Sequence, residues 1–229
     1  MGAIAFAQGQ NPSLAELLDQ FQTTNFSRQL EVGKQIANLG DVGALPVLES
    51  WLTHEDRHLR GNAALVFASL GDGRGFDALR GILTDRSYRP LGQGIAFVAG
   101  NMAAPAWWMP AQIGADRYYA VHLLGQLKDP RALDLLVPLL DDAEINYAVA
   151  WALGEIGDRR AIQPLIATLR DRDAHVRISA IQSLEKLGAT EGLTAIRALL
   201  TDNALPNAGD QVSVAATAKA AIAKLQREP

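Results

Sequence analysis

Apolar residues recur along the chain at the spacing of an amphipathic helix. Between residues 173 and 187 they stand at positions 176, 180, 181, 184 and 187, on one face of a helix with 3.6 residues per turn. The same spacing occurs in two other stretches, at Leu59, Ala63, Ala64, Phe67 and Leu70 and at Ile145, Val149, Ala150, Leu153 and Ile156. The pattern predicts helices that bury the same face. Small residues at two of the five positions let neighbouring helices approach closely.

A three-residue corner motif separates these helices from shorter ones. It stands at Leu39-Gly40-Asp41, Leu70-Gly71-Asp72, Leu127-Lys128-Asp129 and Ile156-Gly157-Asp158, and in weaker form at Leu187-Gly188-Ala189. Glycine can adopt the left-handed conformation that ends a helix, and aspartate can cap the next helix. Short helices are therefore predicted after the motifs, over residues 44–52, 76–83, 132–140, 161–169 and 193–200.

Helical hairpins of this size cannot bury their own apolar face, so they must stack on their neighbours. The string Leu-Gly-Asp-x-x-Ala-x-x-x-Leu, followed by Asp-x-x-Val-Arg and Ala-x-x-x-Leu, resembles the short HEAT-like repeats named after phycobilisome lyases. The resemblance spans residues 25–200 and is clearest over 157–188. It implies an all-α fold, a right-handed α-α superhelix of about five to six hairpin repeats. We expect one such solenoid over residues 11–229, with capping helices over 11–22 and 211–226, after a tail or signal remnant over 1–10.

The repeat pattern is interrupted by an insertion over residues 86–115. Two successive corner motifs are 57 residues apart there, against 29 to 31 elsewhere. The stretch holds no acidic residue, and Pro90, Pro105 and Pro110 argue against one continuous helix. It is too short and too often broken to span a bilayer, but shallow insertion of Trp107 and Trp108 into a membrane interface is one hypothesis. A lid, a degenerate repeat and an interaction loop are the alternatives.

Composition and charge exclude several classes of protein. The chain has 21 Lys and Arg against 25 Asp and Glu, with a pI near 5.6, so no basic stripe is present and no nucleic-acid partner is expected. The absence of cysteine excludes thiol catalysis, disulfides and thiolate metal sites. Ala5-Phe6-Ala7 resembles the end of a secretory signal, which leaves both a cytoplasmic and an exported location open.

Tryptophan and tyrosine are concentrated in one part of the chain, since seven of the eight lie between Tyr88 and Trp151. The repeat register predicts outward positions at 178, 179, 182 and 186, equivalent to 147, 148, 151 and 155 and to 118, 119, 122 and 126. In the family that the repeats resemble, the longer helices line the concave face. The candidate binding residues are therefore Trp107, Trp108, Tyr118, Tyr119, His122, Tyr147 and Trp151. These rings either extend the core beneath the insertion or form a ligand groove.

Motifs for catalysis are weak. His54-Glu55-Asp56-Arg57-His58 matches the zinc-protease string, but the repeat register places it at a turn instead of on one continuous helix. Gly71-Asp72-Gly73-Arg74-Gly75 coincides with a corner and follows no predicted strand, which argues against a phosphate loop. HEAT-like iron hydroxylases use several His-Glu pairs, whereas this chain has one, and HEAT-like DNA glycosylases need a basic groove. Recurrence of Arg60 and Arg177, and of the corner aspartates, predicts a structural ladder of charge-assisted hydrogen bonds.

The sequence thus predicts a non-enzymatic HEAT-like scaffold that binds a protein or peptide on its concave face, with the aromatic cluster as hot spot. The alternative is a lyase-related protein that holds a tetrapyrrole or another planar ligand in the same groove, which the family resemblance and His122 support. A third hypothesis is a peripheral membrane adaptor that uses Trp107 and Trp108. We expect a monomer with no catalytic residue, metal or cofactor.

Overall fold

The computed structural model describes residues 12–87, 108–207 and 210–227, and the regular structure in these ranges is entirely helical. This confirms the predicted all-α fold. Contacts along the chain divide it into two compact units, Met1–Gly75 and Phe76–Pro229, which are considered separately below as unit 1 and unit 2. The single solenoid over residues 11–229 stays a prediction.

Unit 1 is a small bundle of helices around an aliphatic and aromatic core. It consists of α1 (Leu14–Thr23), α2 (Phe26–Leu39), α3 (Ala44–Leu48), η1 (Glu49–Thr53) and α4 (Arg57–Ser69). Ser13 and Glu16 form a reciprocal capping box that starts α1. Fully buried Phe21, Ile36 and Phe67 belong to the core, and the rings of Trp51 pack against it from η1. Hydrophobic burial of this shared face holds the three longer helices together.

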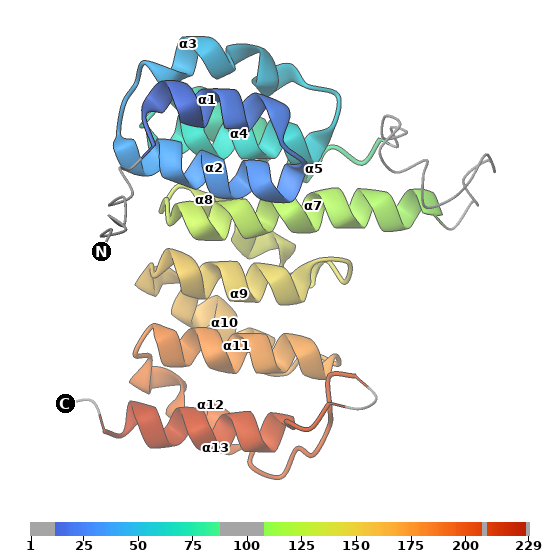
Figure 1. The fold of residues 1–229 in the computed structure, drawn as a ribbon. Helices are drawn as coiled ribbons and strands as arrows, with labels where there is room; N and C mark the ends of the chain where they lie inside the picture. Colours follow the sequence, from blue (N-terminus) through green and yellow to red (C-terminus); the bar gives the residue numbers. More distant parts are fainter. Residues whose placement is uncertain (1–11, 88–107, 208–209, 228–229) are drawn as a thin grey trace, which may run out of the picture. The chain divides into compact units, whose positions relative to one another are not determined.

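Unit 2 is built from longer helices that alternate with shorter ones. The longer helices α7 (Trp108–Leu127), α9 (Asn146–Ile156), α11 (Ala174–Lys186) and α13 (Val214–Leu225) lie side by side (Figure 1). The shorter segments lie behind them: α8 (Ala132–Leu136) with η2 (Val137–Asp141), η3 (Arg159–Ala161) with α10 (Ile162–Thr168), and η4 (Thr190–Gly192) with α12 (Leu193–Arg197). The helix α5 (Gly73–Thr84) crosses the division between the units in its first turn.

The corner motifs end the longer helices as their sequence predicts. Gly40, Gly71, Gly157 and Gly188 all have positive φ angles, between 60° and 83°. At the one corner that lacks glycine, Lys128 adopts the same left-handed region with φ 55°. The aspartate that follows accepts a hydrogen bond from the backbone two residues on, for example Asp158 Oδ1 from Arg160 N–H at 2.9 Å. The corner is therefore set by local backbone preference, and Lys128 occupies it at a conformational cost.

Close approach of the longer helices depends on small residues. A Cβ atom placed on Gly154 of α9 would lie 2.4 Å from Ser183 Oγ and 2.8 Å from Ser183 Cα of α11. Ser183 in turn donates a hydrogen bond to the carbonyl of Ala150 at 2.8 Å, which ties the two helices together. This spacing decides which side chains of neighbouring repeats can touch on the outer face.

Two predicted boundaries differ in the structure. The predicted insertion over 86–115 ends earlier, because α7 begins at Trp108. Pro110 had argued against a helix there, but it lies in the first turn, where its missing N–H has no helical partner to lose. The predicted cap over 211–226 is the shorter helix α13, which starts after the N-cap Ser213. Residues 88–107 and 1–11 lie outside the described residues, so the choice between lid, degenerate repeat and loop and the hypothesis of a signal remnant stay untested.

Candidate ligand-binding face

Five rings from three neighbouring helices form a continuous row on the long-helix side of unit 2. His122 of α7 stacks on Trp151 of α9, with ring centroids 4.5 Å apart and planes 13° apart. Tyr118 of α7 lies 6.3 Å from His122 and 5.7 Å from Tyr147 of α9. Tyr147 stacks on His175 of α11 at 4.4 Å. We call His175, Tyr147, Tyr118, His122 and Trp151 the aromatic row.

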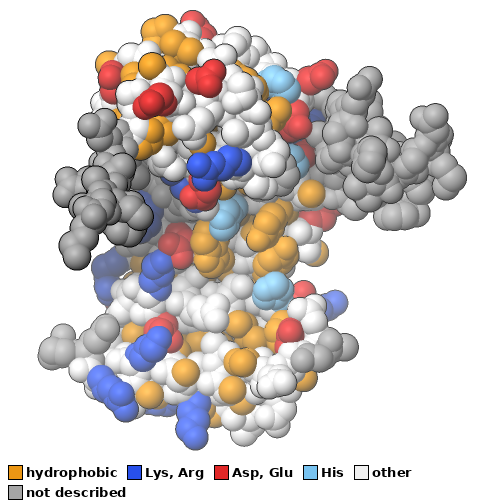
Figure 2. Space-filling view, in the orientation of Figure 1, with side chains coloured by type: hydrophobic (Ala, Val, Ile, Leu, Met, Phe, Trp, Pro, Cys, Tyr) orange, Lys and Arg blue, Asp and Glu red, His pale blue; other side chains and the backbone are white. Residues whose placement is uncertain are grey.

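Helix geometry and repeat length together place these rings. Tyr118 and His122, like Tyr147 and Trp151, are four residues apart and therefore share one helix face. Residues 29 apart occupy equivalent positions on α7 and α9, so the two pairs lie beside each other. His175 stands in the first turn of α11, where its backbone N–H donates to the capping Asp173 at 2.8 Å. Figure 2 shows histidine and hydrophobic side chains gathered on this side of unit 2.

The rings are packed against one another, yet part of each stays accessible. Tyr118 is 39% exposed, and the other four rings are half-buried. Burial, and secondarily the nearby phenol of Tyr118, raise the pKa of Tyr147 above its usual value, which keeps the Tyr147 hydroxyl protonated at neutral pH. Because the rings already stack on their neighbours, a ligand would lie along the row and contact the accessible edges and faces.

The predicted candidates divide into three groups. The structure brings Tyr118, His122, Tyr147 and Trp151 together. Tyr119 is half-buried about 100° further around α7, away from the line through Tyr118 and His122. Trp107 lies outside the described residues, and Trp108 starts α7 but its side chain is not among those described.

The predicted set of outward positions was partly wrong, and it omitted one ring. Ala148 and Ser179 are buried, because they lie one residue further around each helix, on the side that packs against a neighbouring helix. Ile178 is also buried, although it is equivalent to the accessible Tyr118 and Tyr147. His175 was missed, since it precedes the equivalent outward position 178 by three residues. The signal was available in the sequence, because residues three apart share a helix face.

The row gives way to charges toward the C-terminal ends of the same helices. Glu155 of α9 pairs with Lys186 of α11 at 2.5 Å, and Glu185 of α11 pairs with Lys224 of α13. These pairs alternate in sign, so this border carries little net charge. The face as a whole is apolar and aromatic at one end and balanced in charge at the other.

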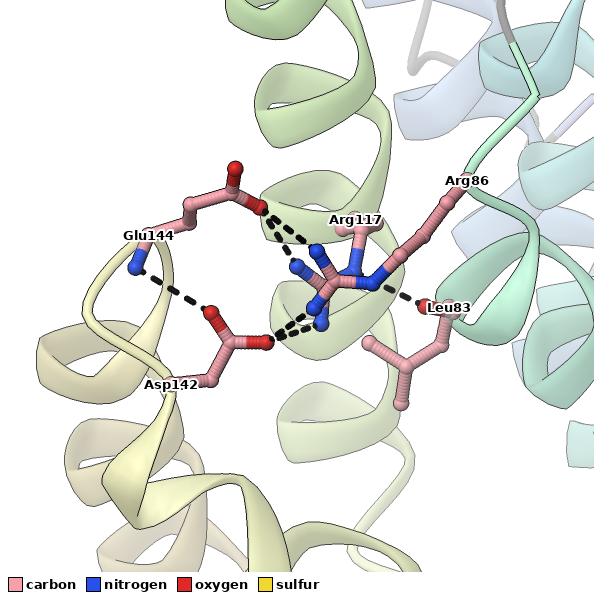
Figure 3. Close-up of polar contacts among 5 residues, drawn as sticks. All are labelled: Leu83, Arg86, Arg117, Asp142 and Glu144. Carbon is pink, nitrogen blue, oxygen red and sulfur yellow. Dashed lines mark hydrogen bonds and ion pairs between the residues drawn. The ribbon is translucent and has the colours of Figure 1, made fainter.

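Between the middle of α7 and the turn that precedes α9, two guanidinium groups share two carboxylates (Figure 3). Arg117, only 2% exposed, donates to Asp142 at 2.5 Å, to Glu144 at 2.7 Å and to the carbonyl of Leu83 at 3.0 Å. Arg86, which is 59% exposed, also contacts Asp142, at 2.6 Å. Burial alone would raise the pKa of Asp142, but the hydrogen bonds from Arg117 and the Glu144 N–H, with both positive charges, lower it overall.

The other candidate motifs have structural roles. The His54–His58 string spans the end of η1 and the start of α4, at a turn as predicted, and His54 Nδ1 accepts a hydrogen bond from Asp56 N–H at 3.0 Å. Arg74 of the glycine-rich string pairs with Asp72 and Glu49 within unit 1. Within the described ranges, no three histidine, cysteine, aspartate or glutamate side chains converge as a metal site would require, and no helix is long and apolar enough to cross a membrane.

Comparison with known proteins supports the repeat prediction for much of unit 2. A family model described as HEAT repeats matches residues 114–185 and 140–208, a range that includes the whole aromatic row. Residues 114–208 are therefore HEAT repeats, and the predicted HEAT-like repeat character is confirmed there. A solved designed armadillo repeat protein is 18% identical, with a TM-score of 0.47 over 93% of this chain and 100% of its own.

Curated relatives are similar over part of their length. The phycocyanobilin lyase subunit alpha of Synechococcus elongatus is 41% identical over 96 residues, or 37% of this chain and 35% of that protein. The bilin biosynthesis protein PecE of Mastigocladus laminosus is 38% identical over 74 residues, 31% of this chain and 28% of that protein. Deoxyhypusine hydroxylase of Schizosaccharomyces pombe is 29% identical over 112 residues, 47% of this chain and 33% of that protein. The chain thus spans about a third of the length of the curated relatives that it matches.

These names contradict the prediction that the chain is not an enzyme. That prediction was based on the weakness of the catalytic motifs, and the names of similar proteins, which are phycocyanobilin lyase subunits, contradict it. The coarser conclusion is that the HEAT repeats of this chain are similar in sequence to part of proteins named as lyase subunits.

Proposed function

We propose that unit 2 binds an open-chain tetrapyrrole of the phycocyanobilin type along the aromatic row, and that the protein acts in a lyase reaction on such a ligand. The observation that carries the proposal is the continuous row of five rings across α7, α9 and α11. The names of the relatives, two of which refer to phycocyanobilin or to bilins, supply the class of ligand.

The dimensions of the row suit an extended conjugated ligand. Successive ring centroids lie 4.4, 5.7, 6.3 and 4.5 Å apart from His175 to Trp151, so a planar conjugated ligand could contact several rings at once. Aromatic side chains favour offset stacking and edge contacts with planar π systems. The protonated Tyr147 hydroxyl adds a hydrogen-bond donor beside the row, and the imidazoles of His122 and His175 add polar groups at two points along it.

A protein partner is part of this proposal. The relatives named "subunit alpha" are by that name components of an assembly with another subunit. The expected protein-binding role of the chain is retained in this proposal, in which a lyase-related subunit works with a second protein. The prediction of a non-enzymatic scaffold is not retained.

A spectroscopic titration tests the proposal directly. Phycocyanobilin added to the purified chain should give a saturable change in its visible absorption. Trp151→Ala should weaken binding about tenfold, because the loss of one stacked ring costs about 1–1.5 kcal/mol. Trp151→Phe, which keeps a ring, and Leu200→Ala, an exposed apolar residue outside the row, are the matched controls.

Both controls should bind like the wild type, and circular dichroism should show that every variant is folded. An absorption spectrum that stays unchanged with saturating wild-type protein would rule out the proposed ligand. Equal affinity of folded Trp151→Ala and wild type would rule out the row as its site.

A further inference from the structure

Three successive repeats of unit 2 use one geometry at an aspartate that follows or ends the shorter-helix segment. In each, Oδ1 of the aspartate accepts a backbone hydrogen bond from two residues on: Asp142 from Glu144, Asp171 from Asp173 and Asp202 from Ala204. In each, Oδ2 faces the side chain that stands 25 residues earlier on a longer helix. We call the three pairs between Oδ2 and the side chain 25 residues earlier the ladder, and they allow neighbouring repeats to be compared.

Two of the three positions hold a guanidinium group. Arg117 Nη2 lies 2.5 Å from Asp142 Oδ2, and Arg177 donates from Nε and Nη2 to Asp202 Oδ2 at 2.9 and 2.8 Å. The middle repeat has Asn146 instead, and its amide lies 3.4 Å from Asp171 Oδ2. A neutral amide at that distance supplies neither a formal charge nor a short hydrogen bond to the Asp171 carboxylate.

The first repeat also shows that such a carboxylate can take a guanidinium from a segment outside the regular ladder. Arg86 follows α5, has no equivalent in the 25-residue spacing, and still contacts Asp142 Oδ2 at 2.6 Å (Figure 3). Asp142 therefore has two guanidinium partners and Asp202 has one, whereas among the described residues the carboxylate of Asp171 has no guanidinium partner. Arg177 reaches the backbone carbonyl of Asp171, at 2.8 Å, but its ion pair is with Asp202.

Asp171 borders a surface cavity that suits a cationic side chain with an apolar stem. The cavity has a volume of about 490 Å³ and lies between η2 and α10. Its apolar wall includes Val137, Leu140, Pro164 and Ala167. Asp141 supplies a second carboxylate, and Arg170 also lines the cavity, so the two acids exceed the one base. Long cationic side chains bury their methylene groups on such walls and keep the charged end at a carboxylate.

We propose that Asp171 and this cavity bind an arginine side chain of a partner protein, which would complete the ladder that Asn146 interrupts. Arginine is assigned because both occupied positions of the ladder hold guanidinium groups, whose fork of donors matches a carboxylate. The site lies against the shorter helices and does not depend on tetrapyrrole binding along the aromatic row.

The test uses the whole chain and the peptide acetyl-Gly-Arg-Gly-amide as the probe, followed by the NMR shifts of the Asp171 and Asp173 amides. The peptide should cause saturable shifts at millimolar concentration, since one exposed ion pair is weak. The same peptide with citrulline, a neutral isostere of arginine, should bind at least about tenfold more weakly, because the charge-assisted bond is lost.

Two variants separate this site from nonspecific attraction. Asp171→Asn, a change of one atom, should abolish the shifts. Asn146→Arg should also abolish them, because the internal guanidinium would occupy the carboxylate, and it should raise the Tm by about 2–4 °C. The proposal is overturned if the arginine peptide gives no saturable shift, if the citrulline peptide binds equally well, or if binding persists in either folded variant.

Discussion

The two units each contain a histidine stacked on a tryptophan, but the two stacks have different structural roles. In unit 1, His54 lies 5.2 Å from Trp51, only three residues away, and the Phe21 ring is nearly perpendicular to Trp51 at 5.7 Å. In unit 2, His122 lies 4.5 Å from Trp151, which comes from another helix 29 residues further along. The first stack closes a local turn over a core. The second joins two repeats and continues into a row.

The difference shows that ring type alone does not produce a continuous aromatic surface. Trp51 packs against the buried cluster of Phe21, Ile36 and Phe67, so its contribution is mostly to stability. Trp151 lies above the close contact between α7 and α9, where a Cβ on Gly125 would come within 3.0 Å of its ring. Repeat stacking, with small residues at the contact, turns separate rings into a continuous surface.

The largest expected effect comes from disturbing that stacking. Gly154→Ala should destabilise unit 2 by about 3 kcal/mol, because the new methyl group would overlap Ser183 and force α9 and α11 apart. Thermal unfolding of the variant measures this loss. Gly81→Ala in α5 is the matched control, since its Cβ would meet nothing within 4 Å and alanine favours the helix. Equal unfolding temperatures for the two variants would refute the packing argument.

The second prediction separates the two stacks. Trp51→Ala should cost about 2 kcal/mol of folding free energy, less than for a fully buried tryptophan because Trp51 is only half-buried. Phycocyanobilin affinity should change little in that variant, in contrast to Trp151→Ala. Chemical denaturation and absorption titration of both variants provide the measurements. A loss of ligand affinity in Trp51→Ala equal to that in Trp151→Ala would place the site elsewhere.

The third prediction concerns the ion network of Arg86, Arg117, Asp142 and Glu144 between α7 and the start of α9. Asp142→Asn should cost about 1.5 kcal/mol at neutral pH, because it leaves the buried Arg117 without one charged partner. The pKa of Asp142 is lower in the folded chain than its usual value of 3.8, so the carboxylate stabilises the fold above that pH. The difference between wild type and variant should therefore shrink as the pH falls below about 4. Urea unfolding at pH 7 and pH 3 tests this, and a pH-independent difference would exclude the carboxylate as its cause.

The smallest effect is expected at the one corner without glycine. Lys128→Gly should stabilise the protein by about 0.5–1 kcal/mol, because glycine adopts the left-handed conformation without the steric cost that lysine bears. Lys219→Gly, within α13, is the control and should destabilise by a similar amount. Tm values in differential scanning calorimetry distinguish the two directions. A loss of stability in Lys128→Gly would show that contacts of the lysine outweigh its backbone cost.

Much of the fold was predictable from sequence because its elements obey local rules. The short helix predicted over 132–140 is observed as α8 with η2, and that over 161–169 as η3 with α10. Pro110 misled the prediction of the insertion, since the effect of proline depends on its position in a helix and a first turn tolerates it. The candidate site was only partly predictable. Helical spacing identified Tyr118, His122, Tyr147 and Trp151, whereas His175 joins them across a helix boundary.

The sequence by itself determined the repeats, the corners and the outward placement of four rings, because each follows from backbone preference and the 3.6-residue period. Tertiary structure decided which rings touch, because contact depends on the separation of α7, α9 and α11, and that separation is set by residues such as Gly125, Gly154 and Ser183. Tertiary structure also showed which carboxylate Asn146 faces. In the sequence Asn146 is one of several residues that differ between repeats, but in space it stands opposite Asp171, at a position where the neighbouring repeats have arginine.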